Sequence, residues 1–313
     1  MSYYLGIDLG GTNIAVGLVN EEEKLVATKS TPTPRMPSSE ELCDAIEGVC
    51  RDCLAENNVE ISDLNGIGIG TPGQVDDSNS TIIFICNLNL RDVNIGKALS
   101  QKMGVPVYVC NDADAAAFGE AKAGSAKGYN KSVTVTLGTG VGTGIIVGSE
   151  IIPSEGGHTV IVYNGEPCNC GRKGCYEVYA SATALIRQTK EAMDKNPESK
   201  LWEVAKENNG VVNGKTIFDA MDRGDKVAEE TFNTYINYVG CGLVDIGNAL
   251  RPDIICLGGG ICAQGERLTK PLTEYMEREQ YPLPNGGYTK IVTCSLGNDA
   301  GIIGAALYSK YKK

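Results

Sequence analysis

Hydrophobic, glycine and polar positions near the start of the chain predict a β-hairpin followed by a third strand. Residues 3–33 carry three apolar runs, separated first by a glycine-rich turn and then by an acidic turn. From Ser38 to Glu56 the apolar residues recur every three or four positions. This spacing predicts an α-helix with Ser38 as its N-cap.

Strands and helices alternate after this helix. Leu64–Gly70 and Val105–Cys110 are short apolar runs that predict buried strands, and residues 113–123 form a small-residue stretch that predicts a helix. Helical patterns continue to Leu250, before a strand at 254–257 and a terminal helix at 300–311. We therefore expect an α/β fold, with sheets covered by helices.

An internal repeat divides the chain. Leu5–Val19 aligns with Val133–Val147 at an offset of 128 residues, and each segment reads as apolar strand, Gly/Thr turn and apolar strand. The alternative is that two unrelated glycine-rich hairpins resemble each other by composition. If the repeat is real, the boundary between its halves lies near residues 115–130.

Length and charge limit the functions that fit. A chain of 313 residues suits about two domains, which usually leave a cleft between them. The formal net charge of −11 is the wrong sign for holding nucleic acid or an anionic membrane surface. No apolar run is long enough for a membrane helix, and no secretion signal opens the sequence. We expect a cytoplasmic protein whose 12 cysteines are reduced, apart from those at a metal site.

Three glycine-rich turns follow predicted strands. A turn of this kind lets backbone N–H groups point at an anion, and an aspartate beside it can hold Mg²⁺ through water. Taken alone, a Gly-Gly hairpin turn needs no ligand, but three at strand ends predict a nucleotide-binding cradle. The residues concerned are Asp8, Gly10, Gly11 and Thr12, then Gly138, Thr139 and Gly140, and then Gly258, Gly259 and Gly260.

Asn111 and Asp112 follow the apolar strand 105–110, where a buried scaffold presents polar side chains. An aspartate in this place can accept the proton of a substrate hydroxyl during phosphoryl transfer. The alternative is that Asp112 or Asp114 only caps the next helix.

His158, Cys168, Cys170 and Cys175 form a candidate metal site. The run CNCGRKGC places three thiols around two glycines, so a loop can wrap one tetrahedral ion with His158 as fourth ligand. Four protein ligands leave no open position, which predicts structural Zn²⁺. The alternatives are free thiols or a redox pair.

Glu155 and Glu177 flank this metal loop. Their carboxylates could orient a sugar by accepting hydrogen bonds from its hydroxyls. The alternative is that both are solvated surface charges.

Together these motifs resemble those of ROK family sugar kinases, most closely the bacterial glucokinases, over essentially the whole chain. The matching motifs are DLGGT at 8–12, GTPG at 70–73, ND at 111–112, LGTGVG at 137–142, EGGH at 155–158, CNCGRKGCYE at 168–177 and LGGG at 257–260. The resemblance implies two actin-like (ribonuclease H-like) α/β domains with a cleft between them and a zinc-binding insert. It places residues 1–115 with the terminal helix 300–313 in the first domain, and 116–299, with the zinc loop 156–177, in the second.

By the same resemblance, Asp112 is the catalytic base. Gly70, Asn111, Asp112, Glu155, His158 and Glu177 bind the sugar, the Gly10–Thr12 and Gly138–Gly140 turns hold ATP phosphates, and Gly258–Gly260 lies beneath adenosine. Mg²⁺ sits near Asp8. Many relatives carry Asn in place of Asp114, so the surroundings of the base differ here.

The implied reaction is ATP-dependent phosphorylation of a hexose at its 6-hydroxyl, with glucose 6-phosphate as the expected product. N-acetylmannosamine, N-acetylglucosamine, fructose and allose stay open as substrates. Relatives are commonly dimers or tetramers, so we expect a homodimer or homotetramer. The family also contains sugar-responsive regulators that carry a DNA-binding region before the first motif. Because Asp8 lies close to the first residue and the net charge is −11, we expect no such region and no nucleic-acid partner.

Overall fold

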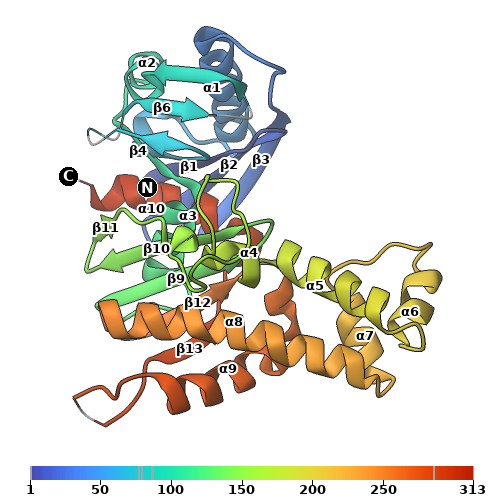
Figure 1. Ribbon diagram of the computed structural model, residues 1–313. Helices are drawn as coiled ribbons and strands as arrows, with labels where there is room; N and C mark the ends of the chain where they lie inside the picture. Colours follow the sequence, from blue (N-terminus) through green and yellow to red (C-terminus); the bar gives the residue numbers. More distant parts are fainter. Residues whose placement is uncertain (1, 77, 79, 86–87, 285, 313) are drawn as a thin grey trace. The chain divides into compact units, whose positions relative to one another are not determined.

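The structure is a computed structural model that describes residues 2–76, 78, 80–85, 88–284 and 286–312 (Figure 1). Its contacts divide the chain into two compact units. The first comprises Met1–Asn130, Gly144–Pro153 and Ser295–Lys313, and the second comprises Lys131–Thr143 and Ser154–Cys294. The domain boundaries given above stay a prediction. None of the helices that the structure describes has the length and apolar character needed to cross a membrane.

A five-stranded sheet with the order β3-β2-β1-β4-β8 forms the centre of the first unit. Strands β1, β4 and β8 run parallel, whereas β2 and β3 continue the sheet as an antiparallel meander. The strands are β1 (Tyr3–Leu9), β2 (Asn13–Asn20), β3 (Leu25–Pro32), β4 (Leu64–Thr71) and β8 (Val107–Asn111). A smaller antiparallel sheet contains β5 (Gln74–Val75), β6 (Ile82–Ile85) and β7 (Leu90–Val93). The predicted hairpin, third strand and two buried strands are confirmed, although β8 begins two residues later than expected.

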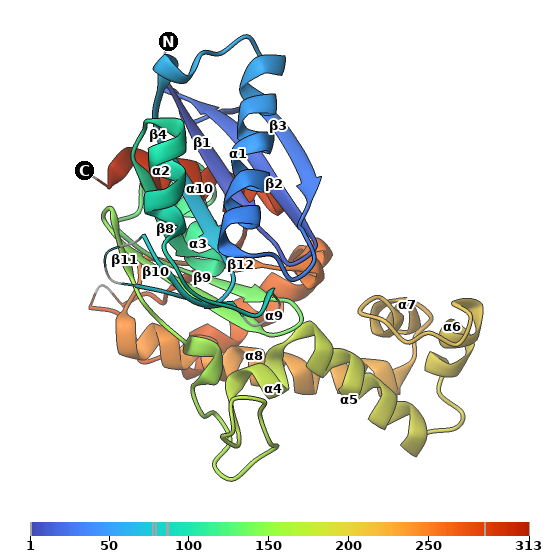
Figure 2. The same cartoon turned by 90° about the horizontal axis from the view of Figure 1, so that it is seen from above.

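Helices cover both faces of this sheet. On one face lie α1 (Ser39–Glu56) and α2 (Ile95–Met103), and on the other lie α3 (Asp112–Lys122) and the terminal helix α10 (Ala300–Tyr311) (Figure 2). The predicted N-cap is confirmed: the Ser38 hydroxyl accepts a hydrogen bond from Glu41 N at 3.1 Å, and the Glu41 carboxylate accepts one from Ser38 N at 2.8 Å. This capping box fixes the first turn of α1, whose apolar residues are buried against the sheet.

Glycine sets how closely α10 approaches the sheet. Gly6 is paired with Gly17 on β2 and with Gly68 on β4, so the three form a row across neighbouring strands. A Cβ at Gly6 or Gly68 would overlap the carbonyl oxygen of Ile302 or of Ala305 on α10. The helix backbone therefore lies directly on the sheet backbone at this row.

The second large sheet has the order β11-β10-β9-β12-β13, which matches strand for strand the order in the first sheet. Its strands are β9 (Lys131–Leu137), β10 (Val141–Val147), β11 (Glu150–Ile152), β12 (Ile254–Gly258) and β13 (Lys290–Thr293). Strand β12 runs parallel to both β9 and β13. The predicted internal repeat is thus confirmed as a repeat of topology, because β9 and β10 occupy the places of β1 and β2.

The second unit, as far as the structure describes it, also contains helices outside these strands. Its helices are α4 (Tyr176–Ala180), α5 (Ala182–Lys195), α6 (Leu201–Glu207), α7 (Thr216–Asp222), α8 (Lys226–Leu250) and α9 (Glu266–Glu279). The 25-residue helix α8 packs against α4, α5, α7 and α9 (Figure 1). It contacts α4 through the fully buried Tyr176, whose hydroxyl donates to the Val239 carbonyl at 2.9 Å. This contact anchors the chain where it leaves the predicted metal loop.

We expect Gly68→Ala to destabilise the protein by about 2–3 kcal/mol, because the new methyl group must displace the α10 backbone at Ala305. Gly48→Ala is the matched control. Gly48 lies inside α1, and a Cβ there would meet nothing within 4 Å. This control should gain about 0.5–1 kcal/mol from helix propensity. Urea unfolding of both variants measures the difference, and equal stabilities would contradict the close approach of α10.

Candidate active site

The strand ends of the first sheet bring four predicted site residues together. Asp8 on β1 is paired with Gly70 on β4, and Thr71 is paired with Asn111 at the end of β8. Asp112 follows Asn111 directly as the first residue of α3. A Cβ on Gly70 would lie 3.7 Å from the Asp112 Cα, so the absence of a side chain at position 70 leaves room beside the predicted base. All of these residues lie at the carboxyl ends of parallel strands, where open α/β sheets bind ligands.

Asn111, and neither aspartate, is the N-cap of α3. Its Oδ1 accepts a hydrogen bond from Ala113 N at 2.9 Å, and its Nδ2 donates to the Gly73 carbonyl at 3.1 Å. The alternative that Asp112 or Asp114 serves as the cap is therefore wrong, since an amide side chain one residue earlier already fills that place. The Asp112 side chain is exposed, and its Oδ1 accepts a hydrogen bond from Ala113 N at 2.8 Å.

Two carboxylates in this group repel each other. Burial raises the pKa of Asp8 above its ordinary value of 3.8, and the nearby Asp112 carboxylate raises it further. A divalent cation bound between an anionic ligand and Asp8 would offset this repulsion. The Asp8 carboxylate beside an anionic ligand therefore fits Mg²⁺.

The turn after β1 offers two backbone donors. Gly10 N donates to the Asn13 carbonyl at 2.9 Å, which closes the turn. Among the described residues, none accepts a hydrogen bond from the N–H of Gly11 or Thr12, and both residues are exposed. Thr33 supports the turn from the end of β3, because its hydroxyl donates to the Gly10 carbonyl at 2.7 Å and its N–H donates to the Thr12 carbonyl. No pattern in the sequence indicates this role for Thr33, which follows from the register of the meander.

The turn after β9 repeats this arrangement in the second unit. Gly138 N donates to the Gly140 carbonyl at 3.0 Å, and within the part of the chain that the structure describes the N–H groups of Thr139 and Gly140 have no acceptor. The third glycine run lies beside it: β12 pairs with β9 up to Gly258, and a Cβ on Gly259 would overlap the Leu137 carbonyl. Both turns of the repeat thus present a pair of successive N–H donors, a geometry that suits phosphate oxygens.

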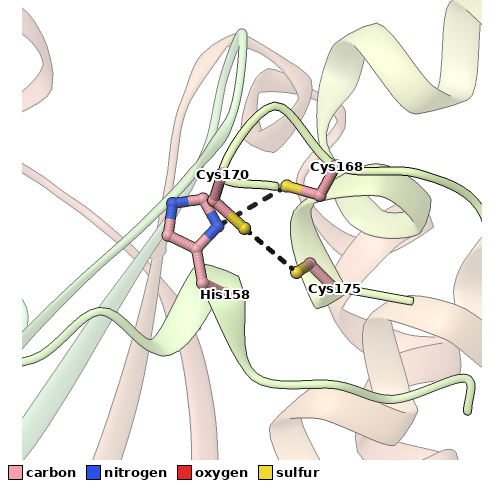
Figure 3. Close-up of side chains that lie close together, drawn as sticks. All are labelled: His158, Cys168, Cys170 and Cys175. Atoms are coloured by element: carbon pink, nitrogen blue, oxygen red, sulfur yellow. Dashed lines mark hydrogen bonds between the residues drawn. The ribbon is translucent and has the colours of Figure 1, made fainter. Parts of the chain in front are cut away.

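The predicted metal ligands are gathered in one place (Figure 3). The ligand atoms of His158, Cys168, Cys170 and Cys175 all lie within 4.8 Å of one another. The Cys170 and Cys175 sulfurs are 3.6 Å apart, and the Cys168 sulfur is 3.7 Å from His158 Nδ1. Two ligand atoms that each lie about 2.3 Å from a tetrahedral zinc ion are about 3.8 Å from each other. The four residues therefore fit a zinc ion and would together fill its coordination sphere.

Backbone hydrogen bonds shape the loop that carries these ligands. Gly171 and Gly174 have positive φ, and the Cys168 N–H donates to the Arg172 carbonyl at 2.8 Å. A hydrogen bond from the Arg172 backbone lowers the pKa of the Cys170 thiol, which favours the thiolate that binds metal. Burial raises the pKa of Cys175 to about 12, so its thiolate would need a cation beside it.

The two predicted sugar-binding carboxylates differ in their surroundings. Glu155 is exposed and immediately precedes the short 3₁₀ turn Gly156–His158, where its carbonyl accepts a hydrogen bond from His158 N at 2.9 Å. Glu177 is half-buried on α4, and its Oε2 accepts a hydrogen bond from Val141 N at 3.1 Å. Sequence reasoning missed this link between the metal loop and the second glycine turn, because residues 36 positions apart carry no pattern that pairs them.

Comparisons with known proteins identify the family of the chain. The family model described as "ROK family" matches residues 4–312. The glucokinase of Streptomyces coelicolor is 33% identical over 317 residues, which cover 98% of this chain and 97% of that protein. The crystal structure of a ROK family glucokinase from Streptomyces griseus in complex with glucose and AMPPNP is 33% identical, with a TM-score of 0.79 and 99% of each chain covered. The xylose repressor of Bacillus spizizenii is 28% identical over 96% of this chain but only 75% of its own length.

We expect Asp8→Asn to stabilise the ligand-free protein at pH 7. The raised pKa means that folding disfavours the Asp8 carboxylate, so its cost is present above the folded-state pKa and is relieved as the pH falls through it. The gain should therefore shrink toward pH 3.8, where the unfolded chain also takes up the proton. Thermal unfolding across this pH range measures the effect. Asp52→Asn, at an exposed position on α1, is the control and should change stability by less than about 0.5 kcal/mol.

Proposed function

Because the chain belongs to the ROK family, we propose that it is an ATP-dependent hexose kinase that phosphorylates glucose at its 6-hydroxyl. The observation that carries this proposal is that Asp112, after β8, lies close to Asp8 on β1, the strand that continues into the Gly10–Thr12 turn. A base, a cation-binding carboxylate and phosphate-binding N–H groups are the parts that phosphoryl transfer requires.

Asp112 is the proposed base. Its Oδ1 is oriented by Ala113 N, and its exposure leaves the carboxylate open to a substrate. Asp112 takes the proton of the 6-hydroxyl while that oxygen bonds to the γ-phosphorus of ATP. The bond from this phosphorus to the β–γ bridging oxygen breaks, and ADP leaves. Positioning and charge stabilisation supply most of the rate enhancement in such transfers.

The glycine turns are the proposed nucleotide contacts. The N–H groups of Gly11 and Thr12, and those of Thr139 and Gly140, bind phosphate oxygens, whereas Gly10 and Gly138 close the turns that aim them. Gly258–Gly260 lies beneath adenosine. Magnesium held near Asp8 neutralises charge on the phosphates.

The proposed sugar contacts include residues at the strand ends of the first sheet and residues of or beside the metal loop. We assign Asn111, Glu155, His158 and Glu177 to sugar hydroxyls, with Gly70 leaving space beside Asp112. Since Glu177 Oε2 accepts from Val141 N, its Oε1 is available for a hydroxyl. His158 Nδ1 faces the thiol cluster, which leaves Nε2 for the sugar. A structural zinc ion at the cluster orders the loop that carries these side chains.

Related substrates and a different class of function remain as alternatives. N-acetylmannosamine, N-acetylglucosamine, fructose and allose present the same reacting hydroxyl to the same catalytic groups. A sugar-responsive regulator is supported by the similarity to the xylose repressor, and a gel shift with DNA tests it. A homodimer or homotetramer in the cytoplasm, which light scattering and cell fractionation would test, completes the proposal.

A coupled assay for ADP with equal concentrations of hexoses and N-acetylhexosamines tests the reaction, and mass and position of the phosphate identify the product. We expect glucose 6-phosphate. Asp112→Asn should lower turnover by about 10²- to 10⁴-fold, because the proton of the hydroxyl loses its acceptor. Asp114→Asn, which removes a carboxylate from the same first turn of α3, should keep most of the activity. Near-normal turnover in Asp112→Asn would remove its assignment as the base.

Elemental analysis of the purified chain should find about one zinc ion per molecule. Cys170→Ser should lose most of this metal, since a hydroxyl is a poor substitute for a thiolate ligand. Cys241→Ser is the control, because Cys241 lies on α8 outside the cluster. A wild-type protein that carries no metal when purified without chelators would contradict the zinc assignment.

A further inference from the structure

The Glu177 side chain contacts the glycine turn after β9, and this contact requires a glycine at position 140. Its Oε2 accepts a hydrogen bond from Val141 N at 3.1 Å, at the residue where the turn ends and β10 begins. A Cβ on Gly140 would overlap this same Oε2 atom. The carboxylate therefore occupies the space that a side chain at position 140 would need. Because Val141 N is already bound, the donors left at the turn are those of Thr139 and Gly140.

Two further contacts hold the turn. Gly157 packs so closely that a Cβ there would overlap the Val141 carbonyl. At the other end of the turn, the Ala182 N–H donates to the Gly138 carbonyl at 2.9 Å, and Ala182 is the first residue of α5. Glu177, Gly157 and Ala182 thus fix both ends of the turn, while the Thr139 side chain between them is exposed.

These contacts lie next to the metal ligands along the chain. Gly157 immediately precedes His158, and Glu177 comes two residues after Cys175. The intervening Tyr176 is fully buried, and its N–H donates to the Thr159 carbonyl at 2.7 Å, which joins the His158 side of the loop to the Cys175 side. The positions of His158 and Cys175 are therefore coupled, through their chain neighbours, to the groups that hold the Gly138–Val141 turn.

We propose that Glu177 is a positioning residue for the nucleotide, and that the metal site sets the geometry of the phosphate-binding turn through it. The metal thus supports ATP binding as well as sugar binding. This inference rests on the proposed function for the identity of the anion at the turn. The dependence of the turn on the metal loop is measured without catalysis.

Two measurements without sugar test the proposal: hydrogen exchange of the Val141 amide, and binding of the ATP analogue AMPPNP. Both are made on zinc-loaded and on chelator-treated protein. We expect metal removal to speed exchange at Val141 by about 10- to 100-fold, the range for losing a hydrogen bond to a charged acceptor. AMPPNP should bind about 3- to 30-fold more weakly, because an unfixed turn must be ordered on binding. Glu177→Ala with zinc in place should give the same two changes, whereas Glu177→Gln keeps an oxygen acceptor and should restore most of the protection.

Glu155→Ala is the matched control, since Glu155 also flanks the metal loop but makes no hydrogen bond to the turn in the part of the chain described. It should leave Val141 exchange and AMPPNP binding unchanged. Unchanged exchange and AMPPNP affinity in chelated protein would overturn the proposal. If chelation unfolds the protein, Glu177→Ala decides, and wild-type protection of Val141 in that variant overturns it. A protein that phosphorylates no sugar would refute the proposed kinase while leaving these two measurements valid.

Discussion

Close approach of one backbone segment to another, which glycine alone permits, is the constraint on which this structure depends. In the first unit, Gly6 and Gly68 let α10 lie directly on the sheet. At Gly304 on the same helix, a Cβ would overlap the Ala115 carbonyl oxygen of α3. Helix α3 begins at Asp112, so the packing of glycine against backbone fixes the start of that helix relative to the strand ends. Larger residues would separate the layers and shift the carboxylate from the groups around it.

The sequence predicted local structure well, because local structure follows from spacing and capping. The hairpin of β1 and β2 and the Ser38 cap come from patterns within about 20 residues. The repeat at Val133 is found because a short local pattern recurs, although its two copies lie far apart in the chain. The packing of α10 on Gly6 could not be predicted, since the two are almost 300 residues apart and glycine is equally common in turns. Asn111 as the cap of α3 was missed for a different reason. Asp and Asn cap helices equally well, so only the backbone geometry separates neighbouring candidates.

In the candidate site, too, the residue types could be predicted from the sequence, but the long-range contacts that position them could not. The types of residue needed for a metal, a base and phosphate contacts are visible in the motifs, and the structure places His158 with the three cysteines as their spacing predicts. The hydrogen bonds that aim these groups are not visible. Thr33, just after β3, supports the first turn, and Glu177 on α4 supports the second. With a net charge of −11, the protein must bind anions through such aimed N–H groups and a cation, since its surface charge would repel them.

A metal ion suits the task of positioning Glu177, because the loop before Glu177 has too little buried surface to be held by packing alone. Residues 159–173 are mostly exposed or half-buried, and a loop with so little apolar surface gains little from burial. Four bonds to one ion stabilise such a loop without a core, and they do so in a defined geometry. A rigid loop can then hold two groups at once: His158 Nδ1 lies against the Cys168 sulfur, while Glu177 reaches back to Val141. The half-buried position of Glu177 follows from this second contact, which a surface charge would not make.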